Sequence, residues 1–146
     1  MTFATFAASG HPAPAAPPLG QSAGYQPGVC NIGPAEIARR RRSGWTGVIA
    51  TIVLFAVLVA IGAPPIARLL VAAPAVIAAS GFLQAWLKFC AGFGSVGVFN
   101  FDAVGTTQGV VDPAAKRADR RRALQISLAS FAIGILVGVV AVLLPV

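Results

Sequence analysis

The side chains that most often carry out chemistry are few in this sequence. Its 146 residues include two Cys, one His and four Asp or Glu. The histidine, His11, lies in a Pro- and Ala-rich N-terminal stretch where no second polar group is expected to join it in a dyad or triad. Because catalysis needs polar groups that converge on one point, we predict a protein that is not an enzyme and holds no cofactor.

The four acidic residues have structural interpretations. Glu36 and Asp112 stand where helices are expected to begin, close to the positive end of the helix dipole. Asp119 has Lys116 and Arg122 three residues away on either side, so we expect an ion pair with one of them. Asp102 lies near glycines and is expected to be a turn residue.

The two cysteines, Cys30 and Cys90, leave three possibilities open. Two thiolates fall short of the four ligands of a structural zinc site, and no other Cys or His pair completes one, so no metal site is predicted. We expect inert packing at both positions. A redox pair or reactive thiol is one alternative, and a metal site completed by a second subunit is another.

The composition excludes an ordinary soluble domain. Hydrophobic residues make up 57% of the chain and charged residues only 10%, whereas soluble domains are about a quarter charged. Three long windows contain no charge: 43–67, 69–87 and 123–146. Each is long enough for the roughly 20 helical residues that cross a bilayer. We predict an all-α membrane protein with three transmembrane helices, at about 44–63, 66–88 and 123–145.

Local signals place the helix ends. Gly62-Ala63-Pro64-Pro65 ends one helix and starts the next, so helices 1 and 2 should form an antiparallel hairpin. Pro74 is expected to bend helix 2. Asp112-Pro113 and Gly33-Pro34 are helix starts that lie well before the charge-free windows. Helices 1 and 3 are therefore predicted to extend beyond the membrane on the cytoplasmic side.

The basic residues predict the orientation. With three spans, ten of the 11 Lys and Arg residues fall on one side of the membrane, and only Arg68 falls on the other. Positively charged flanks stay in the cytoplasm, so the N-terminus should be inside and the C-terminus outside. Both cysteines then lie on the cytoplasmic side, where no stable disulfide is expected.

Two arginine clusters could suggest nucleic acid, but both adjoin membrane windows. We attribute them to topology and to anionic lipid headgroups, because no aromatic residues or DNA-binding motif accompany them. The predicted partners are therefore the lipid bilayer and other membrane helices, with no nucleic acid. The arginines concerned are Arg39, Arg40, Arg41, Arg42, Arg120, Arg121 and Arg122.

The remaining parts of the chain are an N-terminal tail and a cytoplasmic loop. Residues 1–29 are predicted to be a disordered Pro/Ala-rich tail, and residues 30–146 a three-helix membrane domain with a loop at 89–122. Within the loop, we expect helix 2 to continue past the membrane edge; an interfacial or re-entrant turn at 89–101 is the alternative. Gly92, Gly94 and Gly97 match a dinucleotide-binding spacing by chance, since no βαβ unit surrounds them.

Small residues on helix 3 predict a packing face. Ser130, Gly134 and Gly138 recur at a spacing of four, which lets another helix approach closely. The partner could be a helix of the same chain or of another subunit. The hydroxyl and amide groups inside the spans are expected to form hydrogen bonds between helices.

Three segments together resemble a group of small uncharacterised prokaryotic integral membrane proteins. These segments are Tyr25–Arg42, Leu83–Cys90 and Asp112–Arg122. The resemblance covers about residues 25–146 and implies a complete small protein of the cytoplasmic (inner) membrane. It implies no activity and no site residues.

These observations favour a non-catalytic membrane protein that serves as an accessory or assembly subunit of a membrane complex. A thiol-dependent redox or metal-handling protein using Cys30 and Cys90 is the first alternative. A small channel or transporter formed by oligomerisation is the second.

Overall fold

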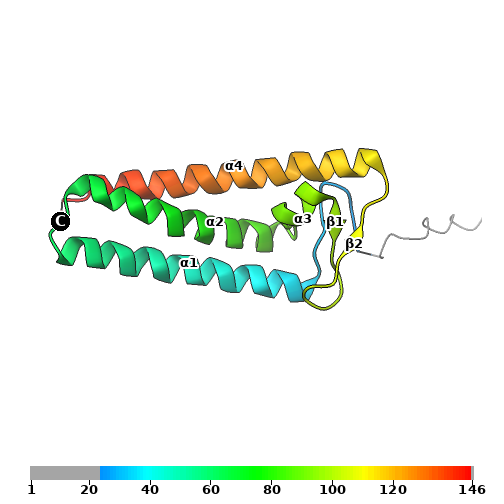
Figure 1. The fold of residues 1–146 in the computed structure, drawn as a ribbon, viewed down its shortest axis with the longest axis horizontal. Helices are drawn as coiled ribbons and strands as arrows, with labels where there is room; N and C mark the ends of the chain where they lie inside the picture. The colour runs from blue at the N-terminus through cyan, green and yellow to red at the C-terminus, as the bar shows by residue number, and fades with distance from the viewer. Residues whose placement is uncertain (1–23, 146) are drawn as a thin grey trace, which may run out of the picture.

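The computed structural model describes residues 24–145, and over this range it is mostly helical (Figure 1). Three helical segments, Pro34–Ala60, Pro65–Trp86 and Pro113–Leu143, are long and apolar enough to cross a membrane. The prediction of three apolar spans is confirmed at this level. The elements in chain order are α1 (Pro34–Ala60), η1 (Pro65–Val71), α2 (Ala72–Trp86), α3 (Ala91–Val96), β1 (Val98–Phe99), β2 (Gln108–Gly109) and α4 (Pro113–Leu143).

The three long segments lie side by side, and α2 packs against both α1 and α4 (Figure 1). One end of the bundle carries α3, the two short strands and the described N-terminal residues. We call this part, formed by residues 24–33 and 87–112, the cap. The other end carries η1 and the end of α4. One end of the bundle therefore carries the cap, and the other, which we call the bare end, consists of helix ends and their connection.

Glycines allow α1 and α2 to pack backbone against backbone. A Cβ added at Gly81 would lie 2.4 Å from the amide nitrogen of Gly44, and one at Gly47 would lie 2.4 Å from that of Ala78. No side chain fits at these separations. The two helices consequently meet at a distance that only glycine permits.

The small-residue face of α4 packs on α2 and η1 of the same chain. A Cβ at Gly134 would lie 2.3 Å from Cγ2 of Val76, and one at Gly138 would lie 3.0 Å from Cβ of Ala72. Ser130, on the same face, is 2% exposed. These three residues thus hold α4 against its own neighbour and are covered within a single chain.

Helix starts fall where the sequence signals place them. Asp112 caps α4, because its carboxylate accepts hydrogen bonds from the amides of Ala114 and Ala115, both at 3.0 Å. Pro34 is the first residue of α1, and Pro65 begins the second segment as a 3₁₀ helix. The change to α-helix occurs at Ala72, so Pro74 lies in the first turn of α2, where its missing N–H costs little.

Helix 2 does not continue past the predicted membrane edge, so that expectation was wrong. α2 ends at Trp86, and Lys88 takes a positive φ of 52° that a continuing helix does not allow. The segment after Lys88 forms α3 and then β1, which pairs antiparallel with β2. Residues 100–107 connect the two strands, in line with the turn expected there. The hairpin is the part of the cap that charge and hydropathy patterns did not predict.

We predict that a methyl group at either helix contact is destabilising. Gly81→Ala and Gly134→Ala should each lower the free energy of unfolding by about 1–3 kcal/mol, because the added Cβ overlaps neighbouring atoms. Unfolding of the purified protein in mixed detergent micelles measures this. Gly109→Ala is the matched control, because nothing lies within 4 Å of a Cβ placed there. Equal stabilities for all three variants would contradict the packing.

Candidate functional site

The densest polar cluster in the described part of the chain lies in and next to the cap. Residues 24–33, which we call the strap, run across the ends of α4, α2 and α1. A tight turn opens the strap, with the Gln26 and Cys30 amides and carbonyls exchanging two hydrogen bonds at 2.9 Å. Gly28 takes a φ of 68° in this turn. Residues 24–29 were assigned to a disordered tail, yet they pack against the helices; His11 lies outside the described residues.

The strap is attached to α4 through Asp119. This carboxylate is 0% exposed. It accepts the Tyr25 hydroxyl at 2.7 Å on one oxygen and the Gly28 amide at 2.7 Å on the other. The predicted ion pair with Lys116 or Arg122 is therefore wrong. A buried carboxylate needs hydrogen-bond donors, and here the strap supplies them.

Tyr25 is held by its ring as well as by its hydroxyl. The ring stacks on Phe99 of β1 with centroids 4.7 Å apart and planes 20° apart. Tyr25 is 6% exposed. Burial, and then the hydrogen bond to Asp119 and its charge, raise the pKa of the phenol above its usual range. The neutral hydroxyl is thus the form that the fold requires.

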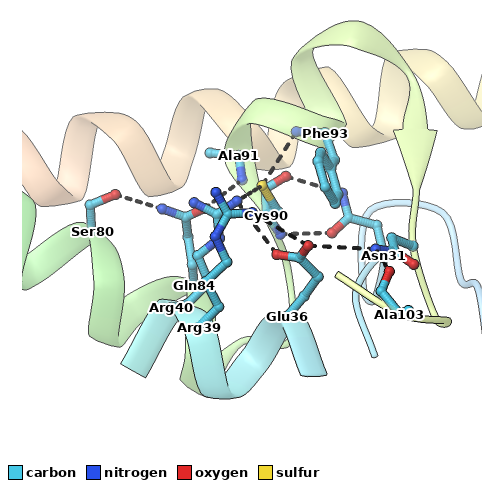
Figure 2. Close-up of polar contacts among 11 residues, drawn as sticks. Asn31, Glu36, Arg39, Arg40, Ser80, Gln84, Cys90, Ala91, Phe93 and Ala103 are labelled. Atoms are coloured by element: carbon cyan, nitrogen blue, oxygen red, sulfur yellow. Dashed lines mark hydrogen bonds and ion pairs between the residues drawn. The ribbon is translucent and has the colours of Figure 1, made fainter. Parts of the chain in front are cut away.

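Asn31 attaches the strap to the end of α2. Its side chain donates to the Cys90 carbonyl at 3.1 Å and accepts the Cys90 amide at 2.7 Å (Figure 2). The Asn31 backbone amide also donates to the Lys88 carbonyl at 3.2 Å. The side-chain amide of Asn31 thereby pairs with the backbone amide and carbonyl of Cys90, in the segment between α2 and α3. Asn31 is 0% exposed and was not among the residues that the sequence singled out.

The side chain of Cys90 is a buried hydrogen-bond acceptor. Its sulfur is contacted by Nη2 of Arg40 at 3.0 Å and by the amide of Phe93 at 3.4 Å, which caps α3 (Figure 2). Cys90 is 1% exposed. Cys30 is half-buried, and its thiol points to the Ile32 carbonyl at 3.8 Å. Both cysteines are free thiols, and the structure places them in different hydrogen-bonding environments.

Glu36 is the second buried carboxylate, at 0% exposure in the first turn of α1. Nη1 of Arg39 lies 3.5 Å from Oε1, and Nη2 of Arg40 lies 3.9 Å from Oε2 (Figure 2). The Asn100 amide also approaches Oε1, at 3.5 Å. Oε2 has no hydrogen-bond partner. Glu36 therefore positions two arginines as well as occupying the favourable end of the helix dipole.

Asn100 organises the β-hairpin. Its side-chain oxygen accepts the Asp102 amide at 2.9 Å and the Thr106 hydroxyl at 3.1 Å, and its nitrogen donates to the Ala103 carbonyl at 2.9 Å. Its backbone accepts the Gly33 amide at 2.7 Å, which ties the hairpin to the strap. Asp102 is a turn residue, as predicted.

The polar side chains within the long helices mostly bond to their own helix. The hydroxyls of Thr46, Thr51 and Ser130 each donate to a carbonyl four residues earlier. Gln84 donates to Ser80 at 2.6 Å and accepts the Ala91 amide at 3.0 Å. The expected hydrogen bonds between helices are replaced at these positions by bonds within a helix, or, for Gln84, to the start of α3.

The arginine clusters have different surroundings. Arg41, Arg42, Arg120 and Arg121 are exposed. Arg122 is half-buried and contacts Gln125 at 3.4 Å. The Arg39 side chain is 57% exposed, whereas that of Arg40 is 24% exposed. Arg40 is therefore the one member of its cluster that is built into the protein.

Arg68 lies in η1 at the opposite end of the bundle, where Nη1 donates to the Leu144 carbonyl at 2.8 Å. Across residues 24–145, no group of three or more His, Cys, Asp or Glu could hold a metal ion. The polar residues of the cap do converge, but chiefly on one another. What this geometry accomplishes is attachment of the strap and the hairpin to the helix ends.

No family model, curated protein or solved structure matches this chain. The residues themselves therefore carry the functional argument.

We predict that Tyr25 titrates only under strongly alkaline conditions. Because its pKa is raised on folding, the neutral phenol stabilises the cap below the ordinary tyrosine pKa of about 10, and this contribution is lost as pH rises through the folded-state value. Tyr25 is the only tyrosine, so phenolate absorbance reports on it alone.

Asp119→Asn should move this absorbance change to lower pH, because it removes the charge that opposes ionisation. Asp102→Asn, which changes an exposed acid of the hairpin, is the control and should leave the titration in place. A wild-type protein that forms phenolate at the ordinary pH would contradict the assignment.

Proposed function

We propose that this protein is a small non-catalytic integral membrane subunit that helps assemble or stabilise a membrane complex. The observation that carries the proposal is an open apolar groove along α2. α1 and α4 both pack on α2, and a hollow of about 280 Å³ remains between them. Its floor is made of alanines, Ala75, Ala78 and Ala79, and its walls include Ile52 and Ile133.

The groove continues toward the bare end of the bundle. A second hollow of about 210 Å³ shares Thr51, Ile52 and Val137 with the first. The Thr51 hydroxyl donates to the Gly47 carbonyl at 2.8 Å, so its hydrogen-bond donor is already used within α1. A small-residue floor between two helices is the kind of surface that accepts a further transmembrane helix. We propose a helix of a partner subunit as the occupant.

The hydrogen bonds in and next to the cap support a structural role for the protein. Asp119, Asn31 and Asn100 are each at most 2% exposed and each joins segments that are distant in sequence. Their hydrogen-bonding groups are engaged in holding the fold. A rigid cap that fixes the helix ends suits a protein that presents a fixed helical surface to a partner.

For the cellular setting, we propose the cytoplasmic (inner) membrane of a prokaryote, with the cap in the cytoplasm and the C-terminus outside. The support is the charge distribution: the arginines near the starts of α1 and α4 and Lys88 after α2 belong to the cap end, and Arg68 in η1 belongs to the other.

The thiol alternative is less well supported than the subunit proposal. The Cys90 sulfur is covered and is bonded to Arg40 and the α3 backbone. Oxidation or metal binding there would require those contacts to open. We therefore do not advance a redox or metal-handling function.

The orientation predicts the outcome of reporter fusions. Alkaline phosphatase fused after the last residue should be active, because it is exported, whereas green fluorescent protein there should be dark. The same reporters inserted at Gly105, in the connection between β1 and β2, should give the opposite pattern. A fluorescent C-terminal fusion would overturn the orientation.

The subunit proposal predicts a co-purifying membrane protein that depends on the groove. Extraction of tagged protein in mild detergent should recover a partner, and Ala79→Trp, which fills the groove, should abolish its recovery. Ile135→Trp is the matched control, because Ile135 is 58% exposed on α4 and does not line the groove. Recovery of monomer alone, or equal loss in both variants, would contradict the proposal.

A further inference from the structure

A second hollow, of different chemistry, lies at the cap end of α1 and α2. It measures about 190 Å³ and has a mixed polar and apolar lining. We call it the interfacial pocket. The residues that matter to the argument are Arg40 and Ser43 of α1 and Val76, Ile77, Ser80 and Gln84 of α2. It shares no lining residue with the apolar groove.

The guanidinium at this pocket is held in place by the protein. Arg40 bonds to the Cys90 sulfur at 3.0 Å, lies 3.9 Å from Glu36 and places its Cζ 6.0 Å from the centre of the Phe93 ring (Figure 2). Arg39 also lies 3.5 Å from Glu36, so this carboxylate is shared between two cations. This cluster of two arginines and one carboxylate therefore keeps a net positive charge, and Arg40 is its member that lines the pocket.

Polar and apolar groups are separated along the pocket. Gln84 lies toward the cap end of α2 beside Arg40, and Ser80 lies one turn earlier in α2, bonded to Gln84 at 2.6 Å (Figure 2). Val76 and Ile77 lie one to two turns before these residues in α2, nearer the centre of the apolar span. A fixed cation with hydroxyl groups at one end and hydrocarbon at the other matches a lipid, whose phosphate and acyl chain are arranged in the same order.

We propose that the interfacial pocket binds the phosphodiester headgroup of an anionic phospholipid. Arg40 pairs with the phosphate, Ser43 and Ser80 line its site, and an acyl chain follows Val76 and Ile77. The exposed arginines of the same helix raise the local concentration of anionic lipid without forming the site. The inference rests on the proposed function, which places the cap in the cytoplasm and so brings the start of α1 to the surface of the bilayer.

The experiment compares lipid binding by variants of the full chain. Native mass spectrometry of the purified protein, titrated with dioleoylphosphatidylglycerol, gives the dissociation constant. Arg40→Gln should weaken binding about tenfold, the effect expected for losing a hydrogen bond between charged groups. Arg41→Gln removes the same charge from an exposed position of the same helix and should change binding by less than about twofold.

A second variant guards against misfolding, because Arg40 also contacts Glu36 and Cys90. Ser43→Leu fills the pocket without touching that network and should weaken lipid binding by a similar factor while leaving the circular dichroism spectrum unchanged. Wild-type binding by Ser43→Leu, or equal losses in Arg40→Gln and Arg41→Gln, would overturn the proposal.

Two further titrants identify the source of the phosphate. Dioleoylphosphatidylcholine, which has no net charge, should bind several-fold more weakly, and inorganic phosphate in excess should not displace phosphatidylglycerol. Equal binding of both lipids, or displacement by phosphate, would overturn the assignment to an anionic lipid. Ala79→Trp should retain lipid binding, so failure of the lipid site and failure of the subunit proposal give different results.

Discussion

The structure depends on two buried carboxylates at the cap. Asp119 and Glu36 are each 0% exposed, and a carboxylate removed from water is tolerated only when donors surround it. The donors come from distant parts of the chain: Tyr25 and Gly28 reach Asp119, and Asn100 reaches Glu36. The hydrogen bonds to Asp119 therefore attach the strap to α4, and the contact of Asn100 with Glu36 brings the hairpin to the start of α1.

The two ends of the bundle are stabilised by different physics. In the span region, backbones approach closely at Gly47, Gly81 and Gly134, so dispersion and backbone contacts hold helices that share an apolar surrounding. In the cap, hydrogen bonds between distant segments specify where each segment lies. The open groove and the interfacial pocket are hollows that neither close helix packing nor hydrogen bonding fills, so both remain available to another molecule.

Sequence patterns predicted what is local and missed what is long-range. Charge-free windows predicted the three spans, because each span is one continuous stretch of sequence, and Asp112 and Pro34 predicted helix starts, because a cap acts within one turn. Asp119 bonds to a residue 94 positions away, and Asn31 bonds to one 59 positions away. The sequence next to either residue does not indicate its partner. For Asp119, the local spacing favoured the wrong partners, Lys116 and Arg122. An exposed ion pair with either residue would stabilise the fold less than the two hydrogen bonds that the buried carboxylate accepts.

The strap has a consequence for biosynthesis. It is made before α1, whereas its partner Asp119 belongs to α4, so the strap cannot attach until α1, α2 and the start of α4 have been synthesised. Closing so long a loop is entropically unfavourable and comes late in folding. A docked strap thus marks a chain whose synthesis has reached α4, because Tyr25 and Gly28 have no Asp119 to bond before then.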